Sequence, residues 1–203
     1  VEPMTLGYAA HFAPRPYPAS TCVSVNDVVV HGIPNEDPEV IRDGDVVSID
    51  LVIGYEGMVL DSARTVIAGE GSEESKRLID ITAASLKAGI AAAKPGNYVK
   101  DIGAAIEATI PKDFGIVKDF CGHGVGYSLH EEPNVPNFAM KGDSPRLEEG
   151  MVLAIEPMIT TGRGEVFVDS ADGYTVFTRD GSLSAHMEHT VLIGKKGPEI
   201  LTK

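Results

Sequence analysis

The chain has 203 residues, of which 43% are hydrophobic, enough to build the core of a single domain. Its 17 lysine and arginine residues against 30 aspartate and glutamate residues give a formal net charge of −13, which argues against nucleic acid or a membrane surface as a partner. No segment reaches the ~18 consecutive apolar residues of a membrane helix, and the first residues show no signal-peptide pattern. With only Cys22 and Cys121 as cysteines, these features predict a cytoplasmic protein.

The first predicted strands, 46–53 and 58–68, flank a hairpin loop at 54–57. This pairing would place Asp50 directly opposite Asp61, with Cβ atoms about 5 Å apart on one face of the sheet. Like charges at that distance destabilise a sheet. One carboxyl group is therefore expected to be protonated, or a basic side chain or a cation is expected to lie between the two.

Two helices are predicted next. The first spans 72–94, with Ser72 as its N-cap and apolar residues recurring every four positions. The second spans 97–110, with Asn97 as its cap and Pro111 at its end. Both helices lie in one block between strands, which favours an α+β fold.

The rest of the chain is predicted to be strands and loops. The segment 133–146 is rich in proline and glycine and is predicted to be a loop between motifs. The remaining predicted strands are 115–120, 151–158, 165–169, 174–179 and 187–193.

Two motifs recur in the same order in the two parts of the chain. The pattern H-x-x-P occurs at 31–34 and again at 130–133. The strand pattern G-x-V-x-[SA]-I-[DE] occurs at 44–50 and again at 150–156. Each half is therefore expected to direct one acidic residue toward a shared interface.

This repeat predicts a single domain of two halves, about 1–70 and 71–203. The first half has no counterpart of the two helices that the second half carries. We therefore expect that several tens of residues are missing ahead of residue 1, or that another polypeptide supplies the helical layer.

Carboxylates within apolar strands are the strongest chemical signal, since charged residues are rarely buried unless they are paired or bound to metal. Arg64, three residues after Asp61, offers an ion-pair partner as the alternative to metal. The four carboxylates are those of Asp50, Asp61, Glu156 and Glu188.

Histidines with glycine or acidic neighbours strengthen the metal interpretation. His123 lies among three glycines directly after a predicted strand, and His31, His130 and His189 have similar neighbours. Four carboxylates and one neutral imidazole carry a charge of −4, which two divalent cations would balance. Oxygen-rich ligands suit paired Mn, Fe, Co or Zn ions.

The segment 120–138 begins with an aromatic residue and continues with Gly-His-Gly, an aliphatic residue and a further Gly at 122–126. His130 follows, and the segment closes with an aliphatic residue, any residue, Asn and an aromatic residue at 135–138. In this it resembles the signature of type I methionine aminopeptidases, the pita-bread metallopeptidases. The similarity continues at 30–34, 155–158 and 184–190. It implies a single catalytic domain over 1–203 with the pita-bread fold, a pseudo-twofold repeat in which antiparallel sheets carry helices on their outer face.

The resemblance implies a dinuclear centre of two divalent ions, Co, Mn, Fe or Zn. Asp61 and Glu188 would bridge the two ions. The five ligands that the resemblance implies are Asp50, Asp61, His123, Glu156 and Glu188. A monovalent cation, Na or K, would be held near Asn26, Val28 and Ser184.

The implied activity is removal of the initiator methionine from nascent proteins and peptides with a small second residue, through a metal-bridging hydroxide. Glu156 would be the general base, and His130 would hydrogen-bond the scissile carbonyl or its oxyanion. His31 would contact the substrate amide.

The resemblance also implies a methionine pocket, to which His31 and His130 would contribute. Leu129 stands where the family usually has Phe, Tyr174 stands where Trp is common, and about six extra residues precede Tyr17. The other implied pocket residues are Tyr8, Tyr17, Cys22, Leu129 and Tyr174.

Three alternatives stay open at this point. A proline-specific peptidase of the same fold usually has a further histidine where this chain has Asp119. A catalytically impaired or binding-only pita-bread protein would usually have lost its metal ligands. An acidic α+β domain with buried ion pairs leaves the signature unexplained. The expected partners are peptide or nascent-protein N-termini and, through Lys195-Lys196, the ribosome, with the chain acting as a monomer.

Overall fold

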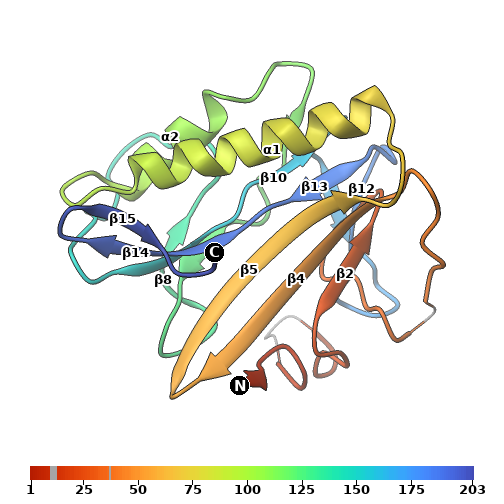
Figure 1. Ribbon diagram of the computed structural model, residues 1–203, viewed down its shortest axis with the longest axis horizontal. Coiled ribbons are helices and arrows are strands. Elements are labelled where there is room, and N and C mark those ends of the chain that lie inside the picture. Colours follow the sequence, from red (N-terminus) through yellow and green to blue (C-terminus); the bar gives the residue numbers. More distant parts are fainter. Residues whose placement is uncertain (10–12, 37) are drawn as a thin grey trace.

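The computed structural model describes residues 1–9, 13–36 and 38–203. Two helices, α1 (Glu73–Ala92) and α2 (Val99–Glu107), lie side by side against the strands (Figure 1). The strands in this part of the chain are β1 (Glu2–Pro3), β2 (Cys22–Val25), β3 (Val28–Val30), β4 (Val46–Tyr55), β5 (Met58–Ile67), β6 (Gly115–Ile116), β7 (Gly122–Gly124), β8 (Glu131–Val135), β9 (Val152–Ile155), β10 (Met158–Thr160), β11 (Val166–Val168), β12 (Val176–Thr178), β13 (Ser184–His186), β14 (His189–Gly194) and β15 (Gly197–Ile200).

These strands form four sheets among the described residues. The two larger sheets are β1-β4-β2, with β5 paired to β4, and the five-stranded β15-β14-β9-β7-β8. The other two, β13-β10-β6 and β11-β12-β3, have three strands each. The pairings between strands are antiparallel, as the predicted α+β class requires.

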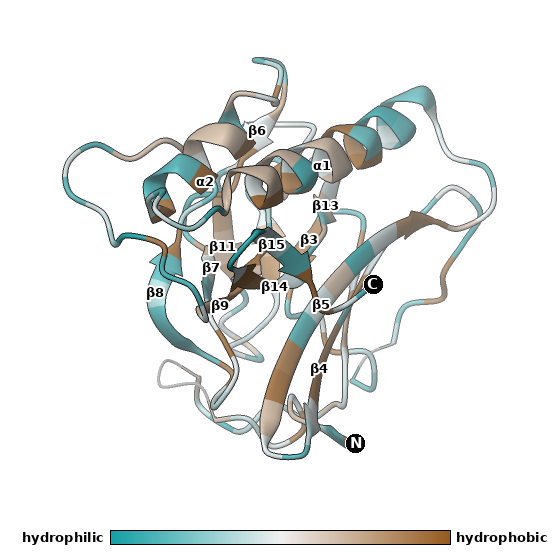
Figure 2. Ribbon diagram, turned by 60° about the vertical axis from the view of Figure 1, so that its left-hand side comes forward, coloured by the Kyte–Doolittle hydropathy of each residue, from teal (hydrophilic) through white to brown (hydrophobic). Residues whose placement is uncertain are grey.

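The helices cover one side of these sheets. The C-terminal half of α1 and all of α2 pack on the five-stranded sheet, where Leu86 and Ile102 join Ile155 and Ile193 in one core. The N-terminal half of α1 packs Leu78 against β10 and β13. Figure 2 shows hydrophilic and hydrophobic segments alternating along α1, as expected of a helix with one buried face.

The first helix begins as its sequence predicts. Ser72 is the N-cap, and its hydroxyl accepts a hydrogen bond of 3.0 Å from the backbone N–H of Ser75. The predicted cap of the second helix, Asn97, is wrong by one residue. Tyr98 is the cap, with its N–H bonded to the Asp101 carboxylate at 2.8 Å, while the Asn97 amide donates to Ala92. The helix ends at Glu107, before Pro111.

The β4–β5 hairpin is present, but its predicted register is wrong. Tyr55 pairs with Met58, so the loop is the two residues Glu56-Gly57, both with positive φ, a geometry that matches the twist of a hairpin. Asp50 is therefore opposite Ala63, and Asp61 is opposite Val52. The two aspartates still share a face, as diagonal rather than direct neighbours.

Other predicted strands differ mainly in length. The segment 115–120 forms only the two-residue β6, and 151–158 divides into β9 and β10. The strand predicted at 187–193 begins at His189. The loop predicted from residue 133 begins inside strand β8. The glycine-flanked strand β7 was not predicted, because glycine has a low strand propensity.

Two threonines join β5 to the second half of the chain. The Thr65 hydroxyl donates to the His186 carbonyl at 2.6 Å and accepts from the His186 N–H at 2.9 Å. The Thr190 hydroxyl makes the same pair of bonds to the backbone of Asp61, at 2.7 and 2.8 Å. Both threonines are buried, so these bonds replace a regular strand ladder at the junction.

The outer face of the hairpin exposes Ile49, Leu51 and Val66 to solvent. Figure 1 shows β4 and β5 extending below α1 as a long, curved ribbon. The helical layer expected for the first half of the chain is not tested by the described residues and stays a prediction. None of the helices in the described residues is long and apolar enough to cross a membrane.

We predict that Gly122→Ala destabilises the protein because β7 is closely packed against β9. A Cβ atom on Gly122 would lie 2.2 Å from the Ala154 carbonyl oxygen. The expected loss is about 1–3 kcal/mol or more in the free energy of unfolding, measured by chemical denaturation. The control is Gly142→Asn, at φ +90° with no atom within 4 Å, a conformation that asparagine tolerates. Equal stability of the two variants would contradict this account of β7.

Candidate metal centre and active site

A pocket of about 510 Å³ receives side chains from both halves of the chain. No described residue of α1 or α2 lines it. Its lining residues are Thr5, Tyr8, Tyr17, Cys22, Val30, His31, Asp50, Val52, Asp61, Phe120, Cys121, His123, Leu129, His130, Glu131, Glu132, Asn134, Glu156, Met158, Tyr174, His186 and Glu188. The structure thus brings together every predicted metal ligand and every predicted substrate-binding residue.

The five predicted metal ligands come from five different positions in the sheets. Asp50 and Asp61 lie on β4 and β5, and His123 is the middle residue of β7. Glu156 directly follows β9, and Glu188 directly precedes β14. The repeated motif therefore places its two acids, Asp50 and Glu156, in the same pocket, as the sequence predicted.

Neighbouring backbone groups hold these acids in place. The Glu188 N–H donates to the Ala63 carbonyl at 2.9 Å, which ties Glu188 to the strand that carries Asp61. Asn137, the asparagine of the sequence signature, is fully buried and donates to the Glu156 carbonyl at 3.1 Å. The side chains are thus presented by fixed backbone rather than by mobile loops.

His123 presents an unprotonated nitrogen to the carboxylates. Its Nδ1 lies 2.9 Å from the Gly124 carbonyl, which can only accept, so Nδ1 carries the proton. Burial lowers the pKa of His123 to about 4, which makes the ring neutral at pH 7. The Nε2 lone pair then faces Glu156 Oε1 at 3.4 Å and Asp61 Oδ2 at 3.9 Å.

The carboxylates are crowded and buried. Asp61, Glu156 and Glu188 expose 6%, 8% and 2% of their surface. Burial raises the pKa of each well above its ordinary value, and the charges of the neighbouring acids raise it further. Burial also raises the pKa of Asp50, although the nearby His186 works against this shift.

No lysine or arginine lines the pocket among the described residues. Arg64, the predicted ion-pair alternative, is exposed and alternates with Ala63 and Thr65 onto the opposite face of β5. The ion-pair explanation of the Asp50–Asp61 cluster is therefore wrong. Protonation of a carboxyl group or a bound cation remains as the explanation of this cluster.

Several polar atoms of the pocket indicate a cation. Buried oxygens of Asp50, Asp61 and Glu188 have no hydrogen-bond partner among the described residues. Ligand atoms of Asp61, His123 and Glu188 lie within 4.8 Å of one another. A lone pair of a neutral imidazole directed at carboxylates is repulsive without a cation between them, and a metal-binding histidine usually donates its other N–H to a carbonyl. The residues present therefore fit divalent metal ions.

Two further histidines lie beside the acids. The hydroxyl of Tyr8 and Nδ1 of His130 are 2.7 Å apart, and the rings of His130 and His123 are in edge contact with centroids 4.4 Å apart. His31 is half-buried at a positive φ of 61°, and desolvation of its ring lowers its pKa to about 4. Burial lowers the pKa of His130 as well. All three rings are therefore neutral at pH 7.

The apolar part of the pocket is built from the predicted methionine-pocket residues. Tyr17 and Tyr174 meet edge to face, with centroids 5.1 Å apart, and both pack with Cys22. The Tyr17 hydroxyl donates to the Gly32 carbonyl at 2.8 Å, and Leu129 packs against Val52. The extra residues that the sequence places before Tyr17 include 10–12, which lie outside the described residues.

The three residues predicted for a monovalent cation lie apart from the pocket lining. The backbone N–H of Ser184 donates to the Asn26 carbonyl at 2.8 Å, so these two residues are neighbours. Val28 begins β3 and pairs with Phe177 of β12. The structure brings Asn26 to Ser184, and the role of all three stays a prediction.

The sequence reasoning missed His186 and Thr5. His186 exposes 2% of its surface, and its Nε2 lies 3.3 Å from Glu156 Oε2. Its position two residues before Glu188 was the available signal, since alternate residues of a strand share a face. Thr5 has a buried hydroxyl in the pocket, and nothing in its sequence context singles it out.

A cluster of unpaired carboxylates and neutral imidazoles beneath an apolar pocket defines a metal-dependent hydrolase. The comparison with known families agrees: the chain belongs to metallopeptidase family M24, which matches residues 5–195. The predicted resemblance and the predicted pita-bread fold are thereby confirmed.

Individual relatives narrow the family further. Methionine aminopeptidase from Aquifex aeolicus (strain VF5) is 50% identical over 205 residues, covering 100% of this chain and 79% of that protein. The crystal structure of methionine aminopeptidase from Thermotoga maritima has a TM-score of 0.92 at 43% identity, covering 100% of this chain and 78% of that one. Prolidase from Pyrococcus furiosus has a TM-score of 0.71 at 28% identity and covers 94% of this chain, which is matched to 50% of the prolidase.

We predict that Mn²⁺ or Co²⁺ raises the Tm of the chelator-treated protein more at pH 8 than at pH 6. Acids with a raised pKa keep protons in the metal-free fold that the unfolded chain releases, and this contribution to stability is lost as pH rises through the raised pKa. Metal must displace those protons at pH 6, whereas His123, with its pKa near 4, is unprotonated at both pH values. The measurement is calorimetry with and without metal, and an equal or larger rise at pH 6 would contradict the buried acid centre.

Proposed function

We propose that this protein is a methionine aminopeptidase, a metal-dependent hydrolase that removes N-terminal methionine from peptides and nascent proteins with a small second residue. The observation that carries the proposal is the buried group of Asp61, His123 and Glu188, with ligand atoms within 4.8 Å, at the base of an apolar pocket. The methionine aminopeptidases of Aquifex aeolicus and Thermotoga maritima are similar to this chain over its whole length.

The proposed centre would hold two divalent ions through Asp50, Asp61, His123, Glu156 and Glu188, and Asp61 and Glu188 would be the ligands shared by both ions. Such ions supply Lewis-acid activation of water and of the scissile carbonyl. The free amine of a peptide N-terminus would offer such an ion one further ligand. This would explain action at chain ends, because an internal peptide bond brings no free amine to the pocket.

The remaining steps belong to the side chains around the acids. Glu156, with its pKa raised by burial, is the proposed general base that accepts a proton and returns it to the leaving amine. If Tyr8 donates its hydroxyl proton to His130 Nδ1, the Nε2–H of His130 is left to donate to the carbonyl oxygen. His31, neutral and at the pocket wall, contacts the substrate amide.

Selectivity for methionine would come from the aromatic and aliphatic part of the pocket. Tyr17, Cys22 and Tyr174 form one packed group, and Leu129 lines the same cavity. These side chains suit an unbranched thioether, which buries apolar surface without requiring a hydrogen bond. Leu129 and Tyr174, the departures from the family pattern, line this wall.

The proline-specific alternative is less well supported. The prolidase match is 28% identical, against 43% for the methionine aminopeptidase structure, and this chain spans only half of the prolidase. The binding-only alternative is disfavoured because all five predicted ligand types are present and line one pocket.

We further propose a monovalent cation at Asn26, Val28 and Ser184, a monomeric state, and action in the cytoplasm, where nascent N-termini emerge. Lys195 and Lys196 are exposed and are the candidate contact to the ribosome in an otherwise acidic chain.

The direct test is hydrolysis of Met-Ala-Ser and Ala-Pro-Ala by the chelator-treated 203-residue chain before and after addition of Mn²⁺ or Co²⁺. We expect metal-restored release of methionine from Met-Ala-Ser and no cleavage of Ala-Pro-Ala. Cleavage of Ala-Pro-Ala alone would favour the proline-specific alternative. A folded, metal-loaded protein that cleaves neither peptide would refute the proposed activity.

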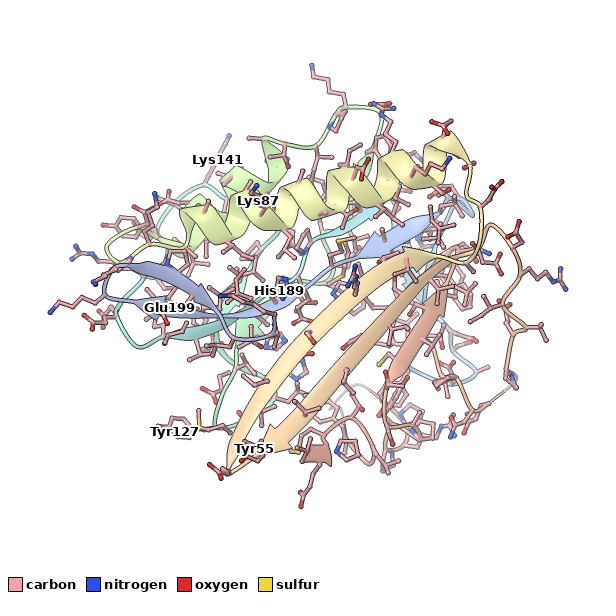
Figure 3. All side chains as sticks on the ribbon, in the orientation of Figure 1. Tyr55, Lys87, Tyr127, Lys141, His189 and Glu199 are labelled. Carbon is pink, nitrogen blue, oxygen red and sulfur yellow. The ribbon has the colours of Figure 1, made fainter. Side chains whose placement is uncertain are left out.

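We predict that Asp61→Asn and Glu188→Gln each abolish peptide hydrolysis, because an amide offers one neutral oxygen where a bridging carboxylate offers two charged ones. Both variants should also bind less metal, as measured by elemental analysis after dialysis. Glu199→Gln is the control, since Glu199 is exposed on the outer strand β15, away from the pocket lining (Figure 3). Near wild-type rates with full metal content in either bridging variant would disprove the assignment.

A further inference from the structure

His186 is a buried imidazole that the proposed mechanism does not use. It ends strand β13, pairs with Met158 of β10 and exposes 2% of its surface. Its backbone is fixed by both hydrogen bonds of the Thr65 hydroxyl. The side chain lies at the wall of the pocket.

The ring is directed at one atom of the proposed general base. Nε2 of His186 lies 3.3 Å from Glu156 Oε2, and this nitrogen has no hydrogen-bond partner among the described residues. The other oxygen of the same carboxylate, Oε1, lies 3.4 Å from His123 Nε2. The Glu156 carboxylate is thus held between two imidazoles, one facing each oxygen.

The two imidazoles cannot have the same role. Nδ1 of His123 is committed to the Gly124 carbonyl, so its Nε2 offers a lone pair and is suited to metal. His186 lies outside the group of Asp61, His123 and Glu188 whose ligand atoms converge. The atom that faces His186 Nε2 is instead a carboxylate oxygen of Glu156, which can accept a hydrogen bond from a protonated nitrogen.

We propose that His186 is a positioning residue whose Nε2–H donates to Glu156 Oε2 and so keeps Oε1 directed toward His123 and the metal centre. A carboxylate that is free to rotate would present either oxygen, or both, to metal and substrate. Hydrogen-bond partners of metal ligands typically change metal affinity or activity by about 10–100-fold when they are removed. This inference rests on the proposed function for its effect on catalysis, but its effect on metal binding does not depend on it.

The test compares His186→Gln, whose amide N–H can replace the Nε2–H, with His186→Leu, which keeps volume but has no donor. His189→Leu is the matched control, because His189 lies outside the pocket lining and bonds Thr202 through Nδ1 (Figure 3). Each variant is measured for its Tm without metal, for Mn²⁺ affinity by calorimetry, for the Co²⁺ absorption spectrum, and for kcat and KM on Met-Ala-Ser.

We expect His186→Leu to lower Mn²⁺ affinity and kcat by about 10–100-fold with little change in KM, and His186→Gln to restore most of both. The His189→Leu control should stay within about threefold of wild type, as expected of a site outside the centre. Should His186→Leu not fold, His186→Met replaces it as the donor-free variant.

Two results would overturn the proposal. Wild-type metal affinity and kcat in the donor-free variant would show that the contact has no positioning role. An equal loss in His186→Gln and in the donor-free variant would show that the ring acts through its shape or as a metal ligand. Failure of the proposed function is recognised separately: the wild-type protein would then release no methionine, while the comparison of metal affinities would remain valid.

Discussion

The structure depends on the cost of burying four carboxyl groups in one pocket without a lysine or arginine among its described lining residues. Burial and mutual repulsion raise the pKa of Asp61, Glu156 and Glu188 well above its ordinary value, so the metal-free fold must hold protons there. Divalent cations remove this cost, because they replace the protons and neutralise the negative charge of the carboxylates. Stability and chemistry are therefore linked through the same atoms, and metal binding acts as a contribution to folding.

Rigid backbone is what makes such a pocket possible. Thr65 and Thr190 join β5 to the second half of the chain with two hydrogen bonds each. The bonds of Thr65 go to the backbone of His186, and those of Thr190 go to the backbone of Asp61. On the other side, Gly122 lets β7 approach the Ala154 carbonyl, which no side chain at that position would allow. The backbone that carries the repulsive groups is thus held by hydrogen bonds that do not use their carboxylates.

The chemistry was more predictable from sequence than the spatial arrangement. Acids within apolar strands and a histidine among glycines are unusual patterns that can be recognised in the sequence alone. The similarity to the family signature, which extends along the chain, identified the family. The hairpin register failed because Gly54 and Tyr55 look like loop residues, while the observed turn needs positive φ only at Glu56 and Gly57. A shift of two residues preserves which face each side chain occupies, so Asp50 and Asp61 still met in the pocket. His186 was missed because its one signal, a position two residues before Glu188, indicates a shared face of a strand and not a chemical role.

The repeat explains why the site sits where it does. Each half ends a strand motif with an acid, Asp50 in one and Glu156 in the other, and each acid is destabilising within its own half. Only when the halves meet do Asp61, His123 and Glu188 converge to within 4.8 Å and offer a cation enough ligands to offset desolvation. A single half would therefore gain no stability from burying its acid. The metal centre belongs to the junction, and the two threonine connections that close this junction are as much a part of the site as the ligands themselves.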